Sequence, residues 1–249
     1  MRGSRLLAAM TVAGLSGALL AGCGDDGNDS GGGSDKPFAG QSADQIAGKA
    51  VAATKQATSL RVKGDMRQAD GKALSLDLAV DERKNCDGTL QTQGARADVR
   101  HVGDAFYLRG DDQYWKNSLK GKPGAAKLLP KLKDKWVKVP AEDSVTKGMC
   151  DKQSLMKALD EDKSERKGMR KGDTTTVGGQ EAIKLTKKTA AGEKLALYVA
   201  TKGEPYILRT TTEGGDEPSS ATFSDYDKDV RPQKPASGET VDLQQLAKS

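Results

Sequence analysis

Reactive side chains are few in this chain of 249 residues, which contains three cysteines and one histidine. Cys23 is the first of them, and it ends an uncharged, mostly apolar run that begins at Leu6. An ionised thiol is a good nucleophile, so a cysteine at this position can take up a diacylglyceryl group. The small residues Ala21 and Gly22 before it suit the narrow site of a peptidase. We therefore predict that the chain is cleaved before Cys23 and lipidated on its thiol.

The segment Leu20-Ala21-Gly22-Cys23 resembles the lipobox of bacterial lipoproteins. Its surroundings agree, because positive charge precedes an apolar run that is shorter than the roughly 20 apolar residues of a membrane span. The alternative is an ordinary secretory signal with an incidental cysteine. We predict a lipoprotein signal peptide over residues 1–22, and a mature protein held at the extracytoplasmic face of the cell membrane by its lipid anchor.

Residues 23–41 are predicted to form a flexible polar tether, because Asp25–Lys36 contains no apolar residue and is rich in glycine and serine. Each buried acyl CH₂ contributes about 0.8 kcal/mol, so two or three chains such as palmitate anchor a protein stably. The remaining residues, 42–249, are enough for one domain with its own core.

Cys86 and Cys150 remain as a pair once Cys23 is lipidated. Disulfides persist in exported proteins. A bridge here would stabilise the folded state by about 4 kcal/mol in the chain-entropy model, because it would close a long loop. Two free buried thiols, or a metal pair without further ligands, are the alternatives. We predict the disulfide.

No set of residues suggests an enzyme. His101 lies in a predicted strand, where solvent exposure or a structural hydrogen bond is its expected role, and no second histidine, free cysteine or glycine-rich phosphate loop accompanies it. The acidic cluster Asp160–Asp162 is expected to be a solvated helix end. We expect no catalytic residue, no cofactor and no metal, and the net charge of +5 is too mild to suggest a nucleic-acid partner.

The lysine-rich segment 116–138 surrounds Leu128, Leu129 and Leu132 with basic residues. It is interpreted as a charged face over a small apolar stripe. The alternative is that it lies against anionic lipid headgroups, to which each nearby lysine would add about 1 kcal/mol.

Helices are predicted at three places. Ser42 and Gln45 fit a capping box, and apolar residues at helical spacing follow, which indicates a helix over about 43–58. Two shorter helices are expected over 125–132 and about 151–159. The C-terminal segment 237–249 carries Val241, Leu243 and Leu246, which suggests that it docks on the domain.

Strands make up most of the remaining chain. Asp70-Gly71 separates two extended runs, a strong hairpin signal, and apolar residues alternate with polar ones along the second run. The pattern repeats to about eleven short strands, which favours an antiparallel sheet that curls. We predict an α+β domain: a strongly curved antiparallel sheet, a half-barrel, with a few helices plugging its concave face.

Five short segments in this order resemble actinobacterial LppX/LprG-type lipoproteins of the LolA/LolB-like superfamily. They are VGDAFY (102–107), KWVKV (135–139), GGQEAIKL (178–185), LYVA (197–200) and PYILR (205–209). The resemblance implies a half-barrel sheet with helices across its open side, and an apolar cavity between them that binds acyl chains in characterised members.

Inward-facing residues of such a sheet either line a cavity or form a solid core, and the pattern alone does not separate the two. The candidates are Ile46, Ala50, Leu74, Leu76, Leu78, Val80, Val99, Phe106, Leu108, Ile183, Leu185, Leu195, Leu197 and Val199. The expected function is to bind or carry a lipid or glycolipid by its acyl chain. The alternative is a non-enzymatic envelope interaction or sensing module with a filled core and a protein partner that the sequence does not name.

Overall fold

The computed structural model describes residues 37–67, 70–140, 148–159 and 166–246. The predicted signal peptide, Cys23, most of the tether and the acidic cluster 160–162 lie outside the described residues. Lys36–Ser249 forms one compact unit, and the whole described core lies within it.

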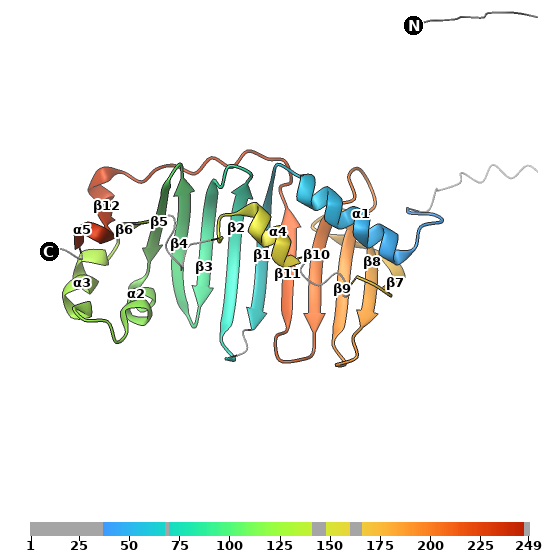
Figure 1. Ribbon diagram of the computed structural model, residues 1–249, viewed down its shortest axis with the longest axis horizontal. Helices are drawn as coiled ribbons and strands as arrows, with labels where there is room; N and C mark the ends of the chain where they lie inside the picture. The colour runs from blue at the N-terminus through green and yellow to red at the C-terminus, as the bar shows by residue number, and fades with distance from the viewer. Residues whose placement is uncertain (1–36, 68–69, 141–147, 160–165, 247–249) are drawn as a thin grey trace, which may run out of the picture. The chain divides into compact units, whose positions relative to one another are not determined.

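Twelve strands form one sheet (Figure 1). All neighbouring strands are antiparallel except β12 and β6, which are parallel. The strands are β1 Ser59–Arg67, β2 Ala73–Asp81, β3 Cys86–Thr92, β4 Ala95–Val102, β5 Ala105–Gly110, β6 Trp136–Pro140, β7 Arg170–Val177, β8 Gln180–Lys188, β9 Lys194–Ala200, β10 Ile207–Glu213, β11 Ser219–Ser224 and β12 Thr240–Asp242. Their order is β12-β6-β5-β4-β3-β2-β1-β11-β10-β9-β8-β7, so β12 and β7 end an open sheet. The predicted α+β fold with a curved antiparallel sheet is confirmed.

The helices are α1 Ala43–Gln56, α2 Asp112–Leu119, α3 Ala125–Leu132, α4 Lys152–Leu159 and the short α5 Leu243–Leu246, with a 3-10 turn at Ser237–Glu239. Helices α1 and α4 cross the same face of the sheet (Figure 1), which we call the inner face. No helix in the described residues has the length and apolar character needed to cross a membrane.

Helix α1 begins where the sequence predicts. The Ser42 Oγ accepts a hydrogen bond from the Gln45 backbone N–H (3.2 Å), and the Ser42 N–H donates to Gln45 Oε1 (2.8 Å), which completes the capping box. Ile46, Ala47 and Ala50 are fully buried against the sheet. The small alanines let the helix lie close to the strands beneath it.

Helix α2 was not predicted, and the C-terminal segment was expected to dock without an assigned element. Helix α2 is capped by the Asp111 carboxylate, which accepts from the Tyr114 N–H (2.6 Å), and it buries Trp115 and Leu119. An N-cap aspartate followed by apolar residues four apart could have revealed this helix. The twelfth strand, β12, pairs with β6 in parallel, so the C-terminal segment does dock on the sheet.

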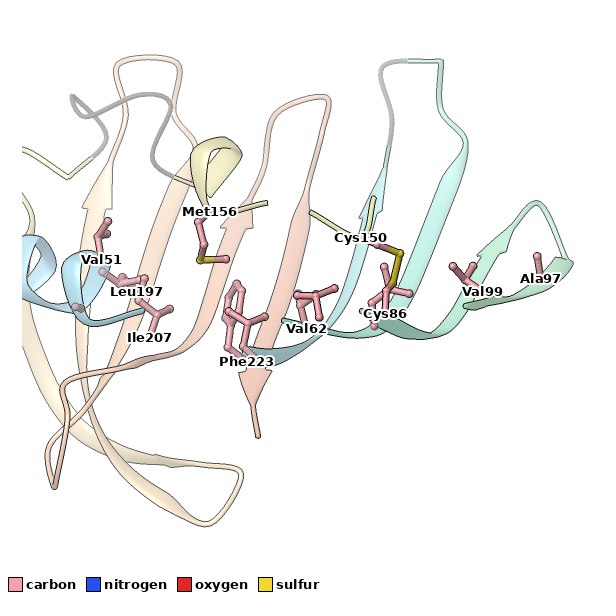
Figure 2. Close-up of a cluster of buried hydrophobic side chains, with 14 of the residues drawn as sticks. Val51, Val62, Cys86, Ala97, Val99, Cys150, Met156, Leu197, Ile207 and Phe223 are labelled. Atoms are coloured by element: carbon pink, nitrogen blue, oxygen red, sulfur yellow. A yellow bond between two sulfur atoms is a disulfide. The ribbon is translucent and has the colours of Figure 1, made fainter. Parts of the chain in front are cut away.

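A disulfide joins Cys86, the first residue of β3, to Cys150, just before α4, with their Cα atoms 5.4 Å apart. Both cysteines are buried, and Figure 2 shows them among the apolar side chains of the inner face. The bond ties the start of α4 to the sheet.

Replacing both cysteines, as Cys86→Ala/Cys150→Ala, is expected to lower the free energy of unfolding by about 4 kcal/mol, because the bond closes a sequence separation of 64 residues. Denaturant unfolding of the oxidised wild type, the reduced wild type and the double variant measures the effect. Equal midpoints for oxidised and reduced wild type would contradict it.

Candidate functional site

Strand register arranges the inner face in rows of side chains that run across the sheet. One row contains Val99, Gly88, Leu78, Val62 and Phe223, in strand order β4, β3, β2, β1 and β11. A Cβ on Gly88 would lie 2.0 Å from the Asp77 carbonyl oxygen, so only glycine fits there. This row is buried, and Met156 of α4 packs among the same residues (Figure 2).

The next row lies nearer the β1–β2 and β8–β9 hairpins. It contains Ala97, Leu90, Leu76, Gly64, Ala221, Thr210, Leu197 and Leu185. Leu76 and Leu90 are only half-buried, and Met66, in the row beyond, is 39% exposed. Helices α1 and α4 cross the other half of the strands (Figure 1). Within the described residues, apolar surface of this row stays partly exposed at Leu76 and Leu90, whereas Ala97, Leu185 and Leu197 are buried.

A hollow of about 200 Å³ lies between α1 and strands β9 and β10, and we call it the inner hollow. Its apolar lining comes from Val51, Met169, Leu195, Leu197 and Ile207. The polar part of its lining includes Thr210, Thr212 and Ser219. Ligand sites for drug-sized molecules usually measure about 300–1,000 Å³, so a full acyl chain needs the open row beside the hollow or an outward movement of α1.

The fourteen predicted cavity residues fall into three groups. Leu195 and Leu197 line the inner hollow, while Leu74 and Leu76 are half-buried on the open part of the inner face. The others are buried side chains of the core: Ile46, Ala50, Leu78, Val80, Val99, Phe106, Leu108, Ile183, Leu185 and Val199.

Val51, Met169, Ile207 and the threonines of β10 are site residues that the sequence reasoning missed. Val51 follows Ala47 by four positions on the buried side of α1, so helical periodicity could have found it. Met169 precedes β7, and Thr210–Thr212 show no apolar alternation, so neither carried a signal.

Both backbone polar groups of Ile207, the N–H and the carbonyl oxygen, form hydrogen bonds with side chains. Register between β9 and β10 shifts after Ile207, and its N–H donates to Thr54 Oγ1 of α1 (3.0 Å), a fully buried contact. The Tyr226 hydroxyl donates to the Ile207 carbonyl oxygen, and burial raises the pKa of Tyr226. These bonds lock α1 onto β10 at the edge of the hollow.

Lys152, at the start of α4, is buried and donates from Nζ to the carbonyl oxygen of Lys55 (2.8 Å), in the last turn of α1. A cation is favoured at a helix C-terminus, so this contact couples the two helices that cover the inner face.

Asp227 fastens the turn after α1. Its Oδ1 accepts from the Thr58 N–H (2.7 Å) and Oγ1 (3.0 Å), and its Oδ2 accepts from the Tyr206 hydroxyl (2.6 Å). The bond from Tyr206 is the main cause that lowers the pKa of Asp227, and the same bond raises the pKa of Tyr206 to about 12.

His101 is buried, and its Nδ1 lies 2.7 Å from the carbonyl oxygen of Lys84. A carbonyl only accepts, so Nδ1 carries the proton and the histidine makes a structural hydrogen bond. Among the described residues, no three His, Cys, Asp or Glu side chains group as metal ligands would.

No family model matches this chain, and no curated protein matches it in sequence. Solved structures do match. LprF from Mycobacterium bovis has a TM-score of 0.52 at 14% identity, over 78% of this chain and 97% of that one. The lipoprotein LppX from Mycobacterium tuberculosis has a TM-score of 0.48 at 15% identity, over 76% and 97%. A LolA superfamily protein from Nitrosomonas europaea has a TM-score of 0.30 at 11% identity, over 77% and 96%.

At 14% identity the likeness to LprF establishes the fold and nothing finer. The chain therefore shares the fold of LprF, which agrees with the curved-sheet fold that its five sequence segments predicted.

Replacing Tyr206 by Phe is expected to cost about 1 kcal/mol of unfolding free energy at neutral pH, allowing for solvent screening. The pKa of Asp227 is lowered on folding, so its stabilisation is present above its ordinary value of 3.8 and is lost as pH falls below it. The pKa of Tyr206 is raised, so stability also falls as pH rises from 10 towards about 12.

Urea unfolding of wild type and Tyr206→Phe from pH 7 downwards tests this linkage. The difference between the two proteins should shrink below the ordinary carboxyl pKa of 3.8. A difference that stays constant with pH would contradict the role of Asp227.

Proposed function

We propose that this protein is a lipid-anchored lipoprotein of the bacterial cell envelope that binds a lipid or glycolipid by its acyl chain. The single observation that carries the proposal is the inner hollow beside α1 with its apolar lining. Half-buried Leu74 and Leu76 of β2 lie further along the same face of the sheet. The LprF-like fold supports the class of protein, and the lipobox-like segment before Cys23 supports the anchor.

The binding mechanism is non-covalent. Apolar surface withdrawn from water contributes about 25 cal/mol per Å², and Leu195, Leu197 and Val51 supply such surface around the hollow. Thr210 and Thr212 place hydroxyls along the same floor, where they can bond an ester or hydroxyl of the ligand. Outward movement of α1 would admit the chain.

A second candidate follows from the ten predicted cavity residues that pack as core. The domain would then be a non-enzymatic envelope module with a filled interior that recognises a protein partner through its surface. Uptake of an acyl probe separates the two candidates.

Leu197→Trp should weaken binding of a neutral fluorescent acyl probe, cis-parinaric acid methyl ester, by at least about tenfold (1.4 kcal/mol), because the larger ring fills the inner hollow. The protein for this titration is the chain from residue 24, which contains the whole compact unit. Thr176→Trp, on the exposed strand β7, is the matched control and should bind like wild type.

Overpacking costs about 1–3 kcal/mol, so the unfolding midpoint of each variant is measured alongside. Thr210→Leu is a smaller change in the floor of the same hollow, and it should also weaken binding of the probe. A wild type that takes up no acyl probe would reject the proposal and favour the filled-core module.

Cys23→Ser should abolish incorporation of labelled palmitate in a bacterial host and release the protein from the membrane fraction. Removal of the only thiol at the predicted cleavage point leaves no site for the anchor. Cys86→Ala/Cys150→Ala is the control and should stay labelled; labelling of the Cys23→Ser protein would refute the anchor.

A further inference from the structure

A second hollow near the β7 end is lined mainly from the face of the sheet opposite α1 and α4, which we call the outer face, and it shares Leu195, Ala196 and Thr211 with the inner hollow. Its volume is about 590 Å³, and we call it the outer hollow. It is lined by Lys167, Gly168, Arg170, Lys184, Thr186, Lys187, Lys188, Lys194, Leu195, Ala196, Thr211 and Glu213. Six of these side chains are cationic and one is anionic, so the hollow is strongly basic.

Strand register explains how the basic side chains gather. Lys188 lies directly opposite Lys194 across β8 and β9, and Thr186 lies opposite Ala196 in the adjacent row. Both pairs point away from Leu185 and Leu197, because successive side chains alternate between the faces of a strand. Arg170 of β7 pairs with Thr186 and extends the same row.

Like charges directly opposite each other destabilise a sheet. The Lys188–Lys194 pair is therefore unfavourable by itself. Glu213 of β10 lies directly opposite Lys194 on its other side and offsets part of this repulsion, although within the described residues neither lysine forms an ion pair with a carboxylate. An anion in the hollow would relieve this repulsion, and the hydroxyls of Thr186 and Thr211 in the lining can donate to its oxygens.

The outer hollow lies beside the point where the tether enters the domain. The Gly168 and Met169 N–H groups donate to the carboxylate of Asp44, in the first turn of α1 (3.2 Å each). Gly168 is itself part of the lining. The described chain begins at Pro37, six residues before α1, so an anchor on Cys23 would hold this end of the domain near the bilayer.

We propose that the outer hollow binds the phosphate-bearing headgroups of anionic lipids in the membrane that holds the anchor. The idea deepens the proposed function and rests on its anchored location. The acyl chains of the anchor would hold the protein at the membrane by themselves, and the headgroup contact would orient the domain with its β7 edge towards the bilayer.

Another basic surface lies at α2 and α3, around Lys116 and Lys133, which line a hollow of about 280 Å³. These lysines belong to the lysine-rich segment 116–138, for which contact with anionic headgroups is the alternative interpretation. Helix α2 contacts β4 and β5, far from β7 in the strand order, so this surface provides a matched control with the same charge change.

The test is co-sedimentation of the chain from residue 24 with vesicles of phosphatidylglycerol mixed with phosphatidylcholine, and with phosphatidylcholine alone. Lys188→Gln/Lys194→Gln should weaken binding to the anionic vesicles about thirtyfold, since each lysine contributes about 1 kcal/mol. Its unfolding midpoint should stay level or rise, because the repulsion is removed. Lys116→Gln/Lys133→Gln should bind within about twofold of wild type.

Equal binding by wild type and Lys188→Gln/Lys194→Gln would overturn the proposal, as would equal loss in both double variants or equal binding to both vesicle types. Binding of inorganic phosphate to the free protein, without binding to the anionic vesicles, would assign the hollow to free phosphate instead of lipid. The parinaric ester titration on the same proteins reports the inner hollow separately, so either site can fail while the other stands.

Discussion

The inner face of the sheet is mostly apolar from β4 to β8. The sheet does not close into a barrel, because its two edge strands, β12 and β7, do not pair with each other. Burial of this face therefore depends on helices, with α1 and α4 over its middle and β8–β10 side and α2 over β4 and β5. Helices α1 and α4 are fastened by bonds that apolar contact alone would not supply: Thr54 to the Ile207 N–H, Lys152 to the Lys55 carbonyl, and the disulfide at the start of α4. These two hydrogen bonds and the disulfide fix where the two helices lie, and so which part of the inner face they cover.

The same fastenings explain why a hollow remains. Small residues of α1, Ala47 and Ala50, sit close to the strands, while Leu76 and Leu90 of the described sheet stay only half-buried. Val51 and Ile207 stand at the border between the solid core and the hollow (Figure 2). A filled core and a ligand groove are thus neighbouring parts of one face, and the helix position separates them.

The outer face is built on a different principle. Near the β6 end, the guanidinium groups of Arg100 and Arg109 lie 4.5 and 4.8 Å from the ring centroid of Trp136. Arg100 and Arg109 also pair with Asp87 and Asp98, so charge there is balanced. Near the β7 end the lysines face one another instead. Glu213, opposite Lys194, is the one acidic side chain in the lining there, so cationic side chains outnumber carboxylates at this end of the face.

Local patterns in the sequence determined the strands, helix α1 with its Ser42–Gln45 cap, and the inner face of β2 and β9, because period-two alternation and capping act over a few residues. Tertiary structure alone decided which inward residues became core. Alternation assigns Leu78 and Leu76 to the same face, yet only Leu78 lies beneath the helices. Pairing register brought Lys188 against Lys194 and set Arg170 in the adjacent row. These hairpin pairs follow from the turn between adjacent strands, whereas the cover over Leu78 depends on contacts between distant segments, which no local pattern encodes.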